Sequence, residues 1–241
     1  VVGNWSTSGS KAIVIDVSAP SNQNDVFKAA LTVKGGATVT IVSSGDGTNN
    51  VWFAPADTTS FAAGDTMTTA AGDATSILAP KNAGTYYLYV VDAAGNVSTA
   101  STAALTVDNT APTVELTDDH ADLIVKNADT VKITATFNKD MAAKPTISID
   151  VSTGTGADVS AAEMSGSGKV WTYDWNVPAE HSGETATVTV AGTDTFGNAY
   201  AGSTSLVYTI DNAAPAGYTV AIDQAVINNA IVWYIFYRIN L

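Results

Sequence analysis

The sequence predicts an all-β protein built from β-sandwich domains in tandem. Three observations support this prediction. Short segments alternate apolar with polar residues, clusters of Gly, Asp, Asn and Ser separate those segments, and two motifs recur along the 241 residues. No window shows a convincing apolar period of about 3.6 residues, the pattern of an amphipathic helix. We therefore expect strands throughout the chain.

The alternation is clearest in four segments. In 130–137 the odd-numbered residues are apolar and the even-numbered ones polar, and in 170–177 two Trp and one Tyr share a face. Segments 146–151 and 185–190 repeat the pattern. Such alternation predicts strands with one buried face. Many short strands separated by turn clusters, such as 43–47, favour sandwiches of about 100 residues each.

Two motifs mark a repeat along the chain. The Asp–Pro motif is an apolar residue, an Asp and a Pro four positions after it, and its Asp residues, at 16, 108 and 211, are 92 and 103 residues apart. The Asp–Asn loop (residues 92–96 and 194–198) has an Asp followed four positions later by an Asn. These loops begin 16 and 17 residues before the Asp of the next Asp–Pro motif. Because both motifs keep nearly the same offset, the chain is predicted to be a tandem array.

The segment 84–98, with the sequence GTYYLYVVDAAGNVS, followed by VDNTAP at 107–112, resembles bacterial immunoglobulin-like repeats. Such repeats build large cell-surface adhesins, and the resemblance covers roughly residues 15–229. It implies tandem immunoglobulin-like β-sandwich domains in an extracellular, cell-surface or secreted protein, where the repeats act as spacers or binding modules.

This resemblance implies domain boundaries at the Asp–Pro motifs. Residues 1–15 would be the terminal strand of a preceding repeat or an exchanged strand. Two complete repeats would span 16–108 and 109–211. Residues 212–241 would begin a third repeat or form an assembly strand, and they end in an atypical apolar tail.

The composition narrows the function classes. There are 23 Asp and Glu against 10 Lys and Arg, giving a formal net charge of −13, which excludes a basic surface for nucleic acid. The absence of Cys excludes disulfides and thiolate metal sites. No apolar run approaches the roughly 20 residues that span a bilayer. Of the acids, 19 are Asp and 4 are Glu, a bias typical of turns and calcium-binding loops.

The loops predict a cluster of oxygen ligands at the junction between the two repeats. In an immunoglobulin-like sandwich the loop between the last two strands lies at the pole where the chain enters. The loop after the strand 130–137 should reach the same pole. The predicted metal ligands are Asp108, Asn109, Asp140, Asp194 and Asn198. These are ligand types that Ca²⁺ uses, and the similar Asp-Asn-x-x-Pro linker of cadherin repeats implies calcium between the domains.

A second set of ligands, Asp16, Asp92 and Asn96, has fewer oxygens because Val17 replaces the Asn. A simpler interpretation stays open for both sets. An Asp before Gly-Asn is also an ordinary hairpin turn, and Asp-Asn before a Pro can simply cap and turn the chain.

Nothing in the sequence predicts an enzyme. The two histidines, His120 and His181, lie in polar loops away from any nucleophile elbow or zinc motif, so we expect solvated surface side chains. Acid pairs are abundant, but none stands out as a glycosidase pair. Of the aromatic residues, Tyr87 and Tyr89 are the better candidates for exposed contacts.

The predicted function is a non-catalytic structural and adhesive segment of a bacterial surface protein, a stalk with calcium-stiffened junctions. Its partners would be neighbouring repeats or copies of itself, with a surface or glycan ligand as a further candidate. The alternative is a self-assembling filament or sheath subunit, in which the segments 11–17 and 231–241 complete the sheets of neighbouring subunits. The assembly residues along the apolar tail would be Ile231, Trp233, Ile235 and Tyr237. A third interpretation, an accessory domain of a secreted enzyme, needs catalytic sequence outside this chain.

Overall fold

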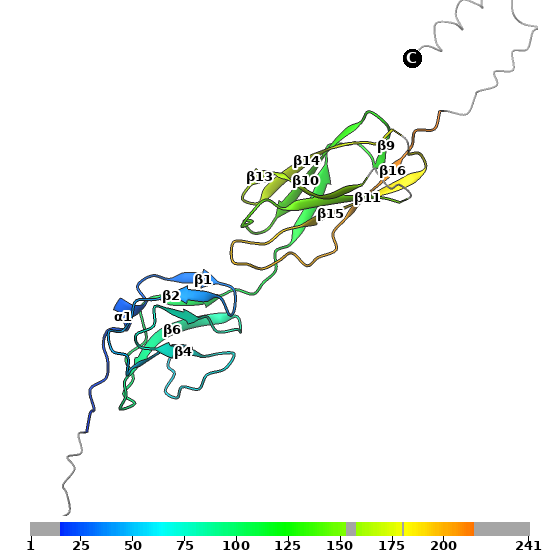
Figure 1. The fold of residues 1–241 in the computed structure, drawn as a ribbon. Helices are drawn as coiled ribbons and strands as arrows, with labels where there is room; N and C mark the ends of the chain where they lie inside the picture. Colours follow the sequence, from blue (N-terminus) through cyan, green and yellow to red (C-terminus); the bar gives the residue numbers. More distant parts are fainter. Residues whose placement is uncertain (1–14, 153–157, 180, 215–241) are drawn as a thin grey trace, which may run out of the picture.

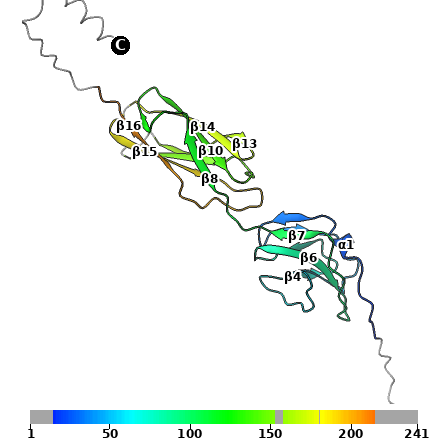
Figure 2. The ribbon, with the colours of Figure 1, turned by 180° about the vertical axis from the view of Figure 1, so that it is seen from behind.

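The structure is a computed structural model that describes residues 15–152, 158–179 and 181–214. Two β domains follow each other along the chain and lie end to end (Figure 1). The view from behind shows the same arrangement (Figure 2). Within the described residues, no helix has the length and hydropathy to cross a bilayer.

The N-terminal domain has a short helix and two sheets. Its elements are α1 (Gln23–Val26), β1 (Leu31–Val33), β2 (Thr38–Thr40), β3 (Asn50–Ala54), β4 (Thr68–Ala71), β5 (Ser76–Leu78), β6 (Gly84–Val91) and β7 (Ala104–Val107). One sheet has the strand order β1-β7-β6-β3-β4, and β2 pairs with β5 in the other. The edge strand β1 is parallel to β7, and the remaining neighbours are antiparallel.

The C-terminal domain is a larger sandwich of the same kind. Its strands are β8 (Val114–Asp118), β9 (Ile124–Val125), β10 (Thr130–Phe137), β11 (Thr146–Val151), β12 (Val159–Glu163), β13 (Ser165–Ser167), β14 (Val170–Asn176), β15 (Glu184–Ala191) and β16 (Leu206–Ile210). The two sheets have the orders β13-β14-β10-β8 and β12-β11-β15-β16-β9. Here too a short edge strand, β9, is parallel to the last strand, β16. The four alternating segments of the sequence coincide with β10, β11, β14 and β15.

Each domain has its own hydrophobic core. In β10 every second side chain is buried, because successive side chains of a strand point to opposite faces. Trp171 and Trp175 of β14 are buried in the same core, as their shared face predicts. In the N-terminal domain, Phe53, Leu88 and Leu105 are fully buried between the sheets. The two separate cores confirm the predicted fold of tandem sandwiches.

The aromatic residues of β6 differ from the expectation. Tyr89 is only 4% exposed, and its hydroxyl donates to the Pro55 carbonyl oxygen over 3.1 Å. The ring of Phe61 packs against Tyr89 with 5.3 Å between the ring centroids. The loop between β3 and β4 therefore folds over this face of the sheet, and the expected exposure of Tyr89 is wrong. Tyr87 is half-buried.

The separate cores predict that a cavity in one domain leaves the other folded. Ile133 is fully buried in β10, so Ile133→Ala should lower the free energy of unfolding of the C-terminal domain by about 2–5 kcal/mol. Ile124→Ala is the control, because Ile124 is 56% exposed and a surface change costs roughly 0.5 kcal/mol or less. Denaturant titration with domain-resolved amide NMR signals measures both. Loss of the N-terminal domain's signals at the same midpoint as the destabilised C-terminal domain would contradict independent cores.

Candidate functional site at the interdomain junction

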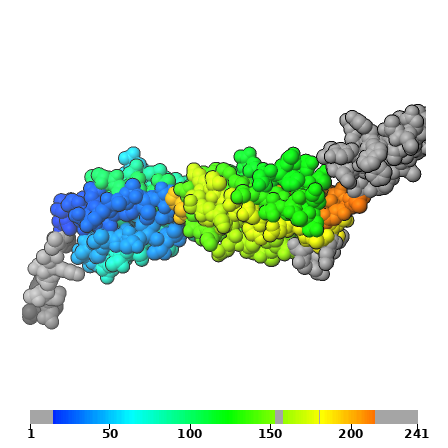
Figure 3. Space-filling model, turned by 90° about the horizontal axis from the view of Figure 1, so that it is seen from above, coloured from blue at the N-terminus to red at the C-terminus, as the bar shows by residue number. Residues whose placement is uncertain are grey.

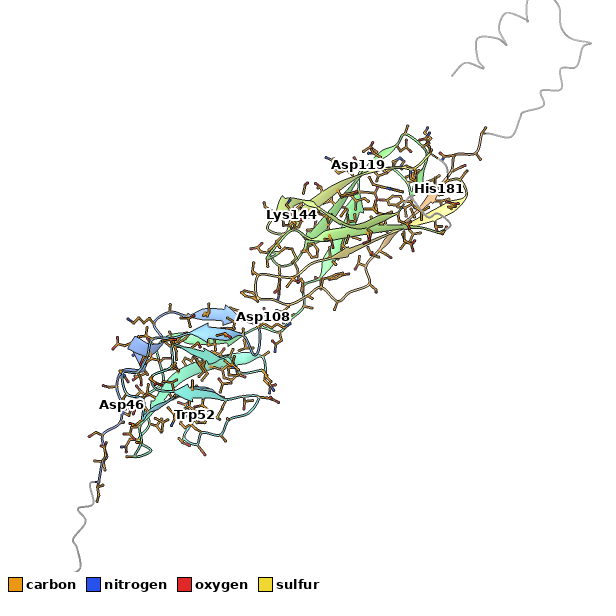
Figure 4. The ribbon with its side chains drawn as sticks, viewed as in Figure 1. Asp46, Trp52, Asp108, Asp119, Lys144 and His181 are labelled. Atoms are coloured by element: carbon orange, nitrogen blue, oxygen red, sulfur yellow. The ribbon has the colours of Figure 1, made fainter. Side chains whose placement is uncertain are left out.

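The linker between the domains is fastened to the N-terminal domain by Asn109. Its side-chain oxygen accepts a hydrogen bond from the Gly35 N–H over 2.8 Å. Its side-chain nitrogen donates to the Lys81 carbonyl oxygen over 2.7 Å. Asn109 therefore faces the N-terminal domain and not the predicted ligand cluster. Figure 4 labels the neighbouring Asp108, which lies where the two domains meet.

The Asp–Asn loop of the C-terminal domain is built around the carboxylate of Asp194. Its Oδ1 accepts the backbone N–H groups of Phe196 (3.0 Å) and Asn198 (2.8 Å), as Asp side chains do in tight turns. Gly197 has a φ of +96°, a left-handed conformation that favours glycine. The side-chain nitrogen of Asn198 donates to Asp194 Oδ2 (3.2 Å) and to the Asp108 carbonyl oxygen (3.0 Å). The loop thus binds the end of the preceding domain.

Lys139 places its ammonium group between two carboxylates. Its Nζ lies 2.8 Å from Asp108 Oδ2 and 3.2 Å from Asp194 Oδ2, and it donates to the Thr110 carbonyl oxygen over 2.6 Å. The Phe196 ring lies beneath the ammonium, with 5.7 Å to the ring centroid, within the range of a cation–π contact. The Asp194 side chain is completely buried, while the Lys139 side chain is 19% exposed.

These contacts shift the pKa values of all three groups. The hydrogen bond from Lys139 is the main cause that lowers the pKa of Asp108 to about 2. Burial alone would raise the pKa of Asp194, but hydrogen bonds from Asn198, Lys139 and Phe196 outweigh burial, so this pKa lies below its ordinary value. The hydrogen bond to Asp108 raises the pKa of Lys139. All three groups are therefore charged at neutral pH.

Asp140 is near this cluster but not part of it. Its backbone carbonyl oxygen accepts the Thr195 N–H over 3.0 Å, while its exposed carboxylate lies beside Gly168 in the turn between β13 and β14. Of the five predicted ligands, the structure therefore brings together Asp108, Asp194 and Asn198. Asn109 and Asp140 turn their side chains elsewhere.

The residues at the junction do not fit a calcium ion in this arrangement. The Lys139 ammonium lies where a cation would have to meet Asp108 and Asp194. Asn198 turns its nitrogen, and not its oxygen, toward both of these residues. Across the described part of the chain, no group of three or more His, Cys, Asp or Glu side chains could hold a metal ion. Calcium at this junction stays a sequence-based prediction that the geometry does not support.

The second predicted ligand set has the same backbone geometry without the lysine. Asp92 Oδ1 accepts the Asn96 N–H over 2.8 Å, and the Asn96 side-chain nitrogen donates to Asp92 Oδ2 (2.9 Å) and to the Asp16 carbonyl oxygen (3.1 Å). Each bond has a counterpart at Asp194. Among the described residues, no Lys or Arg forms an ion pair with Asp16 or Asp92.

The end of the C-terminal domain repeats the fastening seen at Asn109. The Asn212 side-chain oxygen accepts the Asn127 N–H over 2.6 Å, and its side-chain nitrogen donates to the Ala179 carbonyl oxygen over 3.4 Å. The pole where the chain leaves this domain is thus built like the corresponding pole of the N-terminal domain.

A second lysine crosses the junction from the other side. Lys34, directly after β1, donates from Nζ to the Gly197 carbonyl oxygen over 3.2 Å. The space-filling view shows the C-terminal domain's orange segment against the N-terminal domain (Figure 3). Lys126 directly follows β9 and so holds the position in the C-terminal domain that Lys34 holds in the N-terminal one.

The histidines are less solvated than expected. His120 Nε2 lies 3.5 Å from Asp129 Oδ2, and His181 Nδ1 pairs with Glu184. Both side chains are partly buried. His120 and Asp211 line an open cavity of about 380 Å³ at the pole where the chain leaves the C-terminal domain.

The lowered pKa of Asp108 predicts an acid-sensitive junction. Its pKa is about 2 in the folded protein, against 3.8 as its ordinary value, so the ionised carboxylate stabilises the fold above pH 3.8. That contribution is lost as the pH falls from 3.8 toward about 2. The stability of the native protein should fall across this window, and that of Asp108→Asn should fall less. Thermal melts over the acidic range measure this. A carboxyl-carbon NMR titration of Asp108 with a midpoint at or above 3.8 would contradict it.

A known protein family matches most of this chain. Residues 78–229, more than half of the chain, match the model of the bacterial Ig-like domain (group 3). No curated protein matches. Among solved structures, an I-band fragment from titin is similar at 14% identity and a TM-score of 0.38, covering 76% of this chain and 62% of that one. A chimeric titin fragment functionalized with an exogenous peptide from decorin is similar at 13% identity and a TM-score of 0.28, covering 76% and 91%. The chain belongs to the bacterial Ig-like domain (group 3) family.

Proposed function

We propose that this chain is a non-catalytic structural segment of a bacterial extracellular surface protein, in which the Ig-like domains act as a stalk. The observation that carries the proposal is the end-to-end arrangement of the domains (Figures 1 and 2). The chain enters the C-terminal domain at the pole that faces the N-terminal domain and leaves it at the far end. Each domain therefore adds its long axis to the length of the segment.

The short linker supports a stiff stalk. Residues 109–113 join Asp108 to β8, and polar contacts hold them on both sides. Thr110 donates its N–H to Asp108 Oδ1 over 2.8 Å, and Thr113 donates its N–H to the Asn138 side-chain oxygen over 2.9 Å. Pro112 is buried. Interdomain motion is the default where an interface is small and polar, so a linker fixed to both domains favours one orientation.

The family supports the bacterial surface location, since bacterial Ig-like domains are often found on extracellular proteins. In this proposal the described domains act as a spacer that adds length. Adhesion to a surface or glycan is the role of the whole protein that contains them. The sequence predicts that calcium stiffens the stalk. At the junction, the Lys139 ammonium lies between the Asp108 and Asp194 carboxylates and is an alternative cation to calcium.

Small-angle scattering of the full chain tests the stalk. We expect the native protein to have the maximum dimension of two domains end to end. A matched control replaces residues 109–113 with a Gly-Ser sequence of equal length, which behaves as a flexible coil. This variant should show a broader distribution of interdomain distances and a smaller average dimension. Indistinguishable curves for the two proteins would sink the stiff stalk, and a concentration-dependent rise in mass would favour the filament alternative.

A further inference from the structure

We infer that Lys139 supplies the positive charge that closes the junction, so that the ordered arrangement of the two domains needs no divalent metal ion. The sequence alone predicts crowded carboxylates at this pole, and crowded carboxylates require a compensating cation. The geometry points to a cation that belongs to the chain itself.

The ammonium group has its full set of partners. An ammonium has three N–H donors, and Lys139 Nζ has three oxygen partners at 2.6–3.2 Å, one each from Asp108, Asp194 and Thr110. Two of these oxygens belong to carboxylates that were predicted as metal ligands. Lys139 therefore satisfies the oxygens that a calcium ion would have to share at this position.

Burial makes the lysine hard to replace by water. The Asp194 side chain is completely buried, and a buried charge that loses its partner is strongly destabilising. Asn198 cannot take over, because its neutral side-chain nitrogen already donates to Asp194 and to the Asp108 carbonyl oxygen. Only Lys139 provides a formal charge to Asp194 among the described residues.

The chain contains an internal comparison. The pole where the chain enters the N-terminal domain has the same Asp–Asn hydrogen bonds, formed by Asp92 and Asn96. The loop between β2 and β3 at that pole, residues 41–49, contains no Lys or Arg, whereas the loop between β10 and β11 contains Lys139. The Asp–Asn loop thus folds without a lysine, and Lys139 is an addition where two described domains meet. The role inferred for Lys139 follows from its charge and from the burial of Asp194, and it does not depend on the proposed stalk.

A spin-label distance measurement across the junction tests metal independence. The chain has no Cys, so Lys28→Cys and Asp150→Cys, at exposed positions in different domains, give one label in each. The background protein should show a narrow distance distribution that is the same in chelator and in excess Ca²⁺. Lys139→Met should broaden it, and Lys139→Arg should broaden it less, because the charge is kept.

Thermal melting supplies the second readout and the matched control. Lys139→Met should lower the melting temperature of the C-terminal domain by several degrees. Lys144→Met should leave it nearly unchanged, since Lys144 and Glu163 form an exposed pair at 2.9 Å. Adding Asp194→Asn to Lys139→Met should recover part of the loss, because it removes the unpaired buried charge.

Two results would overturn the inference but leave the proposed stalk standing. One is a background distribution that is broad in chelator and narrows in Ca²⁺, since a metal ion would then close the junction. The other is a Lys139→Met protein that matches Lys144→Met in both melting temperature and distance distribution. A distribution that is broad under both conditions would overturn the inference and the stiff stalk together, because the junction would then not be ordered at all.

Discussion

The buried carboxylate of Asp194 is the constraint on which the junction depends. A carboxylate without solvent contact needs several hydrogen bonds and an opposite charge to stay ionised. Backbone N–H groups of its own loop supply part of this need, and Asn198 and Lys139 supply the rest. Lys139 and Asn198 also bind Asp108, the last residue before the linker. The same two side chains that bind the Asp194 carboxylate therefore hold the end of the preceding domain in place. The contacts of one buried carboxylate, made by its own loop and by Lys139 of the loop between β10 and β11, thus join the end of the N-terminal domain to the C-terminal domain.

The same logic explains why each domain has two different poles. At the pole where the chain leaves, an Asn side chain fastens the linker to its own domain, as Asn109 and Asn212 do. At the pole where the chain enters, an Asp–Asn loop binds the carbonyl oxygen of the incoming Asp, at Asp16 as at Asp108. Apolar residues fill the centre of each sandwich, while the contacts at these ends are mainly polar. The hydrophobic cores stabilise each domain by itself, whereas the polar groups at the junction both contribute to stability and join one domain to the next.

How far the sequence could predict this structure depends on which kind of residue carried the information. Strands such as β10 were predictable because a period of two is a direct consequence of strand geometry. The meeting of Asp108 with Asp194 was predictable because a repeated offset reflects a repeated topology. Lys139 was missed although it lies in the loop expected at this pole, because only oxygen ligands were sought there. The burial of Tyr89 was not predictable, since it depends on how the loop between β3 and β4 folds back. The assembly residues of the apolar tail, Ile231 to Tyr237, lie outside the described residues.

The lysines at the junction lie in a chain whose formal net charge is −13. A chain of one dominant charge sign repels itself, which favours solubility but opposes close contact between neighbouring domains. Lys139 and Lys34 both lie at the contact, where they neutralise carboxylates or bind carbonyl oxygens across the boundary. Partly buried ion pairs are screened by salt much less than exposed ones. The acidic surface can therefore keep the chain soluble while a few internal cations hold consecutive domains together, without relying on the concentration of a metal ion in the medium.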